Sequence, residues 1–170
     1  FSAHFEAFKA DTFVVIAPDH PKLKELVSGL PNEEEILTKA KVIADKQKET
    51  KEEIEVEGVF TGRYTIDPVG NGELPIWVAS YALANYGTGI VKCSAHDERD
   101  FRFAKKYGIK LKPVLFPGDS ELRKQVENLD VCYTDTKEGV LIEPQEFNGK
   151  KVGEIREDIA DYLEKNGLAK

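Results

Sequence analysis

The sequence predicts a mixed α/β (α+β) fold, and three observations lead to this class. A short β-branched apolar run lies near the start of the chain, strand-forming segments fill residues 54–94, and segments with helical periodicity flank and interrupt them. Because strands cluster in the middle while helices occupy both flanks, we expect a barrel-like sheet with flanking helices. With 170 residues, the chain is long enough to form one domain with its own core.

The first elements are a strand and two helices. Residues 12–17 form an apolar run closed by Pro18, which is typical of a buried strand, and a short helix is expected after Pro21. In residues 32–49, Asn32 is placed as an N-cap, acidic residues occupy the first turn, and apolar side chains recur on one face. This pattern predicts a surface helix with a solvated, charged outer face.

The middle of the chain contains strand signals and then a helix. The turn at Asn71 and Gly72 accommodates positive φ, so consecutive strands within residues 54–94 are expected to pair antiparallel. Residues 97–108 then favour a helix that Gly108 ends. The apolar residues at helical spacing in it are Phe101, Ala104 and Tyr107.

The last third of the chain alternates short elements before a final helix. Residues 109–117 predict a strand, residues 119–129 one or two helical turns, and residues 130–134 and 139–144 two short extended segments. Gly167 ends the final helix. Its apolar stripe consists of Val152, Ile155, Ile159, Tyr162 and Leu163.

Composition excludes several classes of protein. No segment approaches the run of roughly 20 apolar residues that spans a membrane, and the first residues do not resemble a secretory signal. The formal charge of −7 opposes binding to phosphate backbones. If the domain acts on nucleic acid, other parts of a larger protein must provide most of the binding. Cys93 and Cys132 lack CxxC spacing, which favours a reducing, cytoplasmic setting. The chain contains no methionine, which indicates a piece excised from something longer.

The candidate site is the stretch from the Gly-Thr-Gly turn to Asp100. If a strand ends near Ser94 and a helix starts near Asp97, then Asp97 is an N-cap and Asp100 completes a capping-box-like pair. That structural role explains both acids. It does not explain the flanking His96 and Arg99, and a mixed-sign cluster at the end of a buried strand is where binding sites are commonly built.

The motifs in this region resemble the editing domain of bacterial-type leucyl-tRNA synthetases, the connective peptide 1 insertion. They are, in order, "GVFTGRYTIDPVGNGELPIWVASYALANYGTG", "AHDERDFRFAKKYGI", "KPV" and "GVLIEPQEFNGKKV". The resemblance covers nearly the whole chain and implies one editing domain over residues 1–170, excised from a larger synthetase. It implies no cofactor in this domain and ATP with Mg²⁺ in the parent. The implied partners are the 3′ end of leucine tRNA and the rest of the synthetase, with no membrane and a monomeric state.

The resemblance implies hydrolysis of the ester that joins a wrong amino acid, such as isoleucine or norvaline, to leucine tRNA. The resemblance implies that Asp100 fixes the ammonium group of the substrate. It also implies that Asp97 and His96 line the site and that Ser2 helps to place the water. An activated ester needs only a held carbonyl and a placed water. The residues that border the adenosine and the amino acid are then Leu83, Tyr86, Gly87, Thr88 and Gly89.

The sequence departs from the family at two places. "SAHFEA" stands where the family carries the threonine-rich "TTRPDT", so Ala3 and Ala7 replace threonines and His4 replaces an arginine near the nucleotide. With Ala7 the pocket is expected to widen unless a neighbour fills it. "VKCSAHD" is also one residue shorter than the family pattern, which leaves the orientation of residues 92–94 open.

Two functions therefore stand side by side. One is a working editing domain that uses Asp100 as anchor; the other is an editing fold with weakened or lost hydrolysis that serves a structural or tRNA-positioning role. Asp100 favours the first, and the altered "SAHFEA" favours the second. An editing domain for valine or isoleucine and a free-standing deacylase are weaker alternatives.

Overall fold

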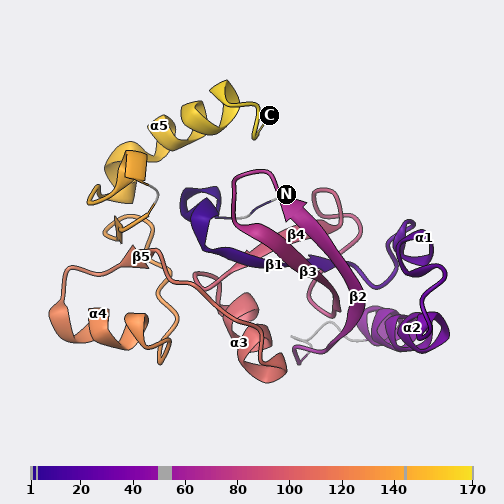
Figure 1. Cartoon of the computed structure of the whole chain (residues 1–170). Helices are drawn as coiled ribbons and strands as arrows, with labels where there is room; N and C mark the ends of the chain where they lie inside the picture. Colours follow the sequence, from indigo (N-terminus) through magenta and orange to yellow (C-terminus); the bar gives the residue numbers. More distant parts are fainter. Residues whose placement is uncertain (1, 3, 50–54, 144, 170) are drawn as a thin grey trace. The chain divides into compact units, whose positions relative to one another are not determined.

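A computed structural model gives the structure of residues 2, 4–49, 55–143 and 145–169 (Figure 1). The mixed α/β class predicted from the sequence is confirmed, and the elements divide into two compact units. The first unit comprises mainly residues 13–66 and 73–93, and the second comprises residues 2–12, 67–72 and 94–170. The prediction of a single domain over residues 1–170 stays a prediction.

The first unit is built on a four-stranded sheet with the order β2-β3-β1-β4. The strands are β1 (Asp11–Ile16), β2 (Gly58–Asp67), β3 (Gly72–Ala79) and β4 (Ile90–Ser94). β1 runs parallel to β3, with Val14 opposite Ile76 and Ile16 opposite Val78. The predicted strand start at residue 54 lies outside the described residues.

The expectation that consecutive strands pair is wrong for β3 and β4, because β1 lies between them. The physical reason is the composition of β1. Five of its six residues are buried, and a strand that is buried on both faces lies inside a sheet rather than at its edge. The N-terminal strand therefore takes a central position.

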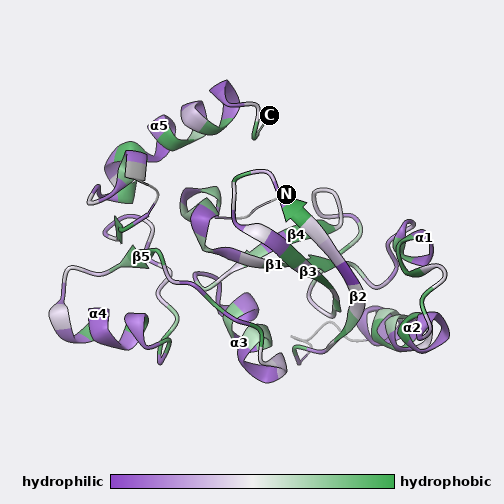
Figure 2. Cartoon of the chain, viewed as in Figure 1, coloured by the Kyte–Doolittle hydropathy of each residue, from purple (hydrophilic) through white to green (hydrophobic). Residues whose placement is uncertain are grey.

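Two helices cover the sheet of the first unit. They are α1 (Leu23–Val27) and the longer α2 (Glu33–Glu49), which begins directly after Asn32 as predicted. The predicted apolar face of α2 is buried and packs in one cluster with residues of β1 and β3. Figure 2 shows β3 as mostly hydrophobic, in keeping with its place in this core. Among the described residues, no helix is long and apolar enough to cross a bilayer.

The second unit contains the remaining helices and a two-stranded antiparallel sheet. Its elements are η1 (Phe5–Ala10), α3 (Glu98–Tyr107), β5 (Leu115–Phe116), α4 (Ser120–Glu127), β6 (Val140–Leu141), η2 (Gln145–Phe147) and α5 (Val152–Lys165). Gly108 adopts a left-handed conformation with φ 66° and ends α3, as predicted. The buried apolar face of α3 centres on Phe103 and Ala104, and Phe101 is only half-buried.

Two predicted strands are shorter or absent in the second unit. The strand expected over residues 109–117 is confined to β5, and residues 130–134 form no strand. The polar groups of residues 130–134 bind a side chain and a loop carbonyl instead of a neighbouring strand. The Tyr133 carbonyl lies 2.8 Å from Nδ1 of His96, and the Cys132 thiol donates to the carbonyl of Ala95.

The final helix α5 packs against η1 and forms the core of the second unit. Its predicted stripe is confirmed, since Val152, Ile155, Ile159 and Leu163 are buried. Tyr162 stacks on Phe8 with ring centroids 6.3 Å apart. Hydrophobic and hydrophilic residues alternate along α5 in Figure 2, as in an amphipathic helix. The short segment that precedes β1 is thus held by the C-terminal part of the chain.

Candidate functional site

The acidic corner where β4 leads into α3 is organised by Asp97. Its Oδ1 accepts hydrogen bonds from the backbone N–H groups of Arg99 at 2.9 Å and Asp100 at 3.2 Å. These contacts confirm the predicted N-cap. Because Oδ1 is engaged by the helix, the Asp97 carboxylate is fixed in orientation.

Asp100 lies in the first turn of α3 and is 7% exposed. Its Oδ2 accepts the backbone N–H of Ser94 at 3.1 Å, which ties the end of β4 to the helix. Ser94 in turn accepts the N–H of His96 through its hydroxyl at 3.2 Å. The corner from Ser94 to Asp100 is therefore a connected hydrogen-bond network. The predicted role of Asp100 in holding an ammonium group stays a prediction.

His96 lies beneath this corner, 1% exposed, with both ring nitrogens engaged. Nε2 accepts the N–H groups of Val114 at 3.0 Å and Leu115 at 3.1 Å, so Nδ1 carries the proton and donates to the Tyr133 carbonyl. Burial is the main cause that lowers the pKa of His96 to about 4. The neutral imidazole thus joins three segments of the second unit, and its predicted role in lining the site stays a prediction.

His4 reaches the same corner from the N-terminal segment. Its Nε2 lies 3.5 Å from Oδ2 of Asp97, with 34% of the His4 side chain and 17% of the Asp97 side chain exposed. The contact with Asp97 raises the pKa of His4 against the opposing effect of burial. Burial alone would raise the pKa of Asp97, but His4 and the N–H groups of Asp100 and Arg99 outweigh it and lower that pKa to about 2.

The other N-terminal site candidates occupy different environments. Ser2 is half-buried, and Ala3 lies outside the described residues. Ala7 is 1% exposed and belongs to the apolar cluster of the second unit, next to Phe8. Glu6 is also buried, and its Oε1 accepts from Nε of Arg156 on α5 at 2.7 Å. Sequence reasoning missed this ion pair because its two residues are far apart in the chain.

The Gly-Thr-Gly turn belongs to the first unit. Leu83 and Tyr86 in the preceding segment are half or more exposed, at 50% and 57%. Gly87 and Gly89 have φ of 58° and 71°, and a Cβ on Gly89 would lie 2.7 Å from the ring of His20. The ring of His20 also holds the turn, since its Nε2 lies 3.0 Å from the Thr88 carbonyl. The positive φ at both positions favours glycine, and at Gly89 the close approach of His20 adds a steric reason.

In the shortened strand β4, Cys93 and Ser94 are buried and Lys92 is half-buried. Cys93 is fully buried, which agrees with the prediction of a small apolar residue. Burial raises the pKa of the Cys132 thiol to about 12, so this thiol is not activated as a nucleophile. In the described ranges, no group of three or more His, Cys, Asp and Glu side chains is placed to hold a metal ion.

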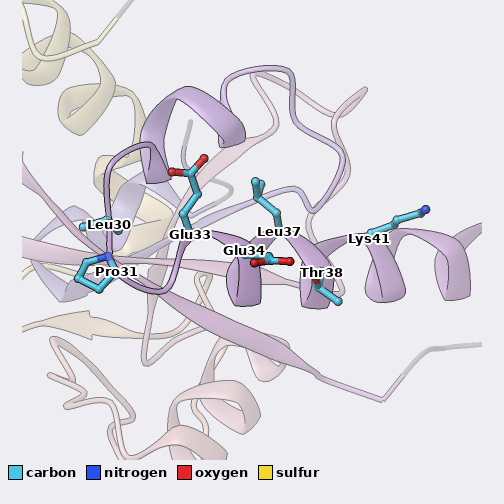
Figure 3. A pocket seen from close by; sticks show the side chains of 7 residues that line it. All are labelled: Leu30, Pro31, Glu33, Glu34, Leu37, Thr38 and Lys41. Atoms are coloured by element: carbon cyan, nitrogen blue, oxygen red, sulfur yellow. The ribbon is translucent and has the colours of Figure 1, made fainter.

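A groove of about 590 Å³ lies on the first unit, between α2 and the loop before it (Figure 3). None of the predicted site residues lines it. Its walls are formed by Leu30, Pro31, Glu33, Glu34, Leu37, Thr38 and Lys41. Glu33 also accepts the backbone N–H of Gly29, so this part of the wall closes the turn after α1.

Comparison with known proteins identifies the family of the chain. The sequence model described as leucyl-tRNA synthetase, editing domain, matches residues 1–164. The chain belongs to this family. It is 38% identical to a leucine–tRNA ligase of Geotalea uraniireducens across all of this chain and 20% of that protein, and 41% identical to one of Thermotoga maritima across 94% of this chain and 19% of that protein.

A solved structure agrees with the fold of this editing domain. The ternary complex of Agrobacterium radiobacter K84 agnB2 LeuRS with tRNA and LeuAMS matches 95% of this chain with a TM-score of 0.57. The match is 22% identical and covers 16% of that chain, so it bears on the fold alone. This editing domain spans about a fifth of the length of the curated relatives it matches.

Proposed function

We propose that this domain hydrolyses the ester of mischarged leucine tRNA, such as isoleucyl- or norvalyl-tRNA, within a leucyl-tRNA synthetase. The observation that carries the proposal is the ordered acidic corner at the start of α3 in a chain of the editing family. Two carboxylates, Asp97 and Asp100, are fixed there by backbone N–H groups. Fixed groups bind a cationic substrate without the cost of ordering them first.

The roles follow from charge and position. A free aminoacyl ester carries an ammonium group beside the scissile carbonyl, and a carboxylate binds it by charge-assisted hydrogen bonds. Asp100 takes this role, so the ester is held where water attacks it. For residues 83–89, which belong to the first unit, a contact with the adenosine is proposed from the family resemblance alone, and Tyr86 is exposed there.

Editing is needed because binding alone discriminates poorly between leucine and similar amino acids. One methylene in an apolar pocket gives only roughly 10- to 200-fold selectivity, so a second hydrolytic sieve is needed to remove isoleucine and norvaline. The whole synthetase supplies the remaining partners in this proposal. ATP and Mg²⁺ act in the parent chain, and no cofactor acts in this domain. The parent enzyme is a monomer in the cytoplasm. It binds leucine tRNA mainly through residues outside this acidic domain.

A second function, an editing fold without hydrolysis that positions tRNA, is favoured by one set of observations. Asp100 holds the backbone of the corner, and His96 holds the backbone of Val114 and Leu115. Ala7 is packed in the core where the family pattern has a threonine. These contacts give the motif a purely structural reason to exist.

Deacylation by the parent enzyme separates the two functions. Isoleucyl-, norvalyl- and leucyl-tRNA are incubated with the wild type, and spontaneous hydrolysis is subtracted. Turnover of the first two esters with little turnover of the leucyl ester supports editing. No turnover of any ester above the blank selects the structural function. Asp100→Ala is expected to abolish the turnover.

A further inference from the structure

His4 approaches a carboxylate that is fixed in position. Its ring lies against Asp97, the residue that caps α3, with Nε2 at 3.5 Å from Oδ2. The other oxygen of Asp97 is held by two helix N–H groups, so the carboxylate cannot turn away. A carboxylate in a fixed position sets both the orientation and the tautomer of an imidazole beside it.

The tautomer determines which nitrogen is available to a substrate. With the proton on Nε2, facing Asp97, the lone pair of the neutral ring is on Nδ1. Nδ1 has no hydrogen-bond partner within the described part of the chain, and a third of the side chain is exposed. The distance of 3.5 Å is long for a hydrogen bond, but such contacts tighten when substrate closes a site.

We propose that His4, oriented by Asp97, is the general base that activates the hydrolytic water. This assignment rests on the proposed editing function and gives that reaction its proton acceptor. It also fits the composition of the segment, since Ser2 carries the one hydroxyl in residues 2–7 and His4 is the one side chain there that titrates near neutral pH.

The step balances without a further reactant. Nδ1 of His4 takes a proton from water as the water oxygen bonds to the carbonyl carbon, and the carbonyl π electrons move to the carbonyl oxygen. Collapse of this tetrahedral intermediate breaks the bond to the ribose oxygen. The proton on Nδ1 passes to that oxygen, which leaves the free amino acid and the 3′-terminal hydroxyl of the tRNA.

The charges around His4 set the pH at which it works. Asp97 faces it from the start of α3, Glu6 comes from its own segment, and Asp100 adds a further negative charge. His96 is a neutral ring whose pKa the charge of His4 helps to lower, and Nε of Arg99 is 3.9 Å from Oδ1 of Asp97. The net effect raises the pKa of His4 above its usual value. Because the base is the neutral form, deacylation is expected to rise as pH increases through that raised value.

Three variants of the parent synthetase test the assignment. His4→Gln keeps a polar side chain without a titrating base, and His4→Arg supplies a permanent cation. Both are expected to lower kcat for isoleucyl-tRNA about 10²- to 10⁴-fold, to change KM little, and to remove the rise with pH. Asp97→Asn keeps a good N-cap while losing the charge. It is expected to lower the pKa of His4, measured by NMR, and to move the rise in rate to lower pH.

The controls make each outcome decisive. Lys39→Ala, an exposed change on α2, is expected to leave deacylation unchanged, and leucylation of tRNA by every variant verifies that the enzyme is folded. Full activity of His4→Arg would overturn the assignment and leave His4 as a cationic contact. Full activity of His4→Gln with an unchanged pH profile would overturn it as well. Absence of turnover in the wild type would instead overturn the editing function and this assignment together.

Discussion

Replacing His96 by phenylalanine tests whether this histidine holds the second unit together. Phenylalanine has a similar ring shape but offers no acceptor for the N–H groups of Val114 and Leu115 and no donor for the carbonyl of Tyr133. These three contacts surround a side chain that is 1% exposed, so water does not replace them readily. The substitution therefore leaves three buried backbone groups without a hydrogen-bond partner, while the apolar packing stays largely intact.

The expected loss is large relative to the stability of a domain. An unsatisfied buried group costs about 1–3 kcal/mol, so three of them lower the free energy of unfolding by at least about 3 kcal/mol. Natural domains have only about 5–15 kcal/mol in total. Acid produces a loss of similar size in the wild type. Lowering the pKa of His96 from 6.5 to about 4 corresponds to about 3 kcal/mol, at about 1.4 kcal/mol per pKa unit.

The sign of this pH dependence follows from the two states. The unfolded chain binds the imidazole proton near pH 6.5, whereas the folded chain resists it until about pH 4. The His96 contribution is therefore complete above pH 6.5 and is lost as pH falls towards 4. Urea unfolding of this 170-residue chain at pH 7 and pH 4 measures both effects. Lys39→Ala, at an exposed side chain, serves as the control and is expected to change stability by less than about 1 kcal/mol.

Two results would refute the reasoning about His96. One is a phenylalanine variant as stable as the wild type at pH 7. The other is a variant that loses as much free energy of unfolding as the wild type between pH 7 and pH 4, since the carboxylates titrate in both proteins and only the His96 part should disappear.

Three further changes have definite expected outcomes. Gly89→Ala places a Cβ 2.7 Å from the ring of His20 at a φ of 71°, so the melting temperature should fall by an amount equivalent to more than about 1 kcal/mol; an unchanged melting temperature would count against the turn geometry. Ala7→Thr puts extra volume and a hydroxyl into a 1% exposed position, so urea unfolding should show a loss of about 1–3 kcal/mol, and leucyl-tRNA turnover should not rise. Arg156→Ala removes the ion-pair partner of buried Glu6. The single variant should therefore lose more free energy of unfolding than the double variant that also carries Glu6→Gln.

Local pattern predicted much of the fold. The N-cap at Asp97, the stop at Gly108, the buried face of α2 and the stripe of α5 all follow from spacing within a few residues, and all are confirmed. The position of β1 was not predictable in this way, because the partner of a strand depends on which surfaces remain to be covered. The short length of β5 and the irregular 130–134 segment were not predictable either. In both, the ring of His96 binds backbone groups that a neighbouring strand would otherwise bind.

The site could be predicted in part. The acids of the AHDERD motif were found from residue type and spacing, and their positions at the start of a helix are as expected. The contact between His4 and Asp97 was not visible in the sequence, since nothing local indicates which distant residue meets an N-cap. The burial of Ala7 and the double backbone contact of His96 were missed for the same reason, because both depend on packing of segments far apart in the chain.

The central claim is that a negative charge at Asp100 holds the substrate ammonium during editing. Asp100→Asn tests it directly, because the amide oxygen still accepts the Ser94 N–H while the charge is lost. Loss of one hydrogen bond to a charged group corresponds to about 1.5–3 kcal/mol. Deacylation of isoleucyl-tRNA by the parent enzyme is therefore expected to fall at least about tenfold, with leucylation intact. Deacylation at the wild-type rate in Asp100→Asn would contradict the account.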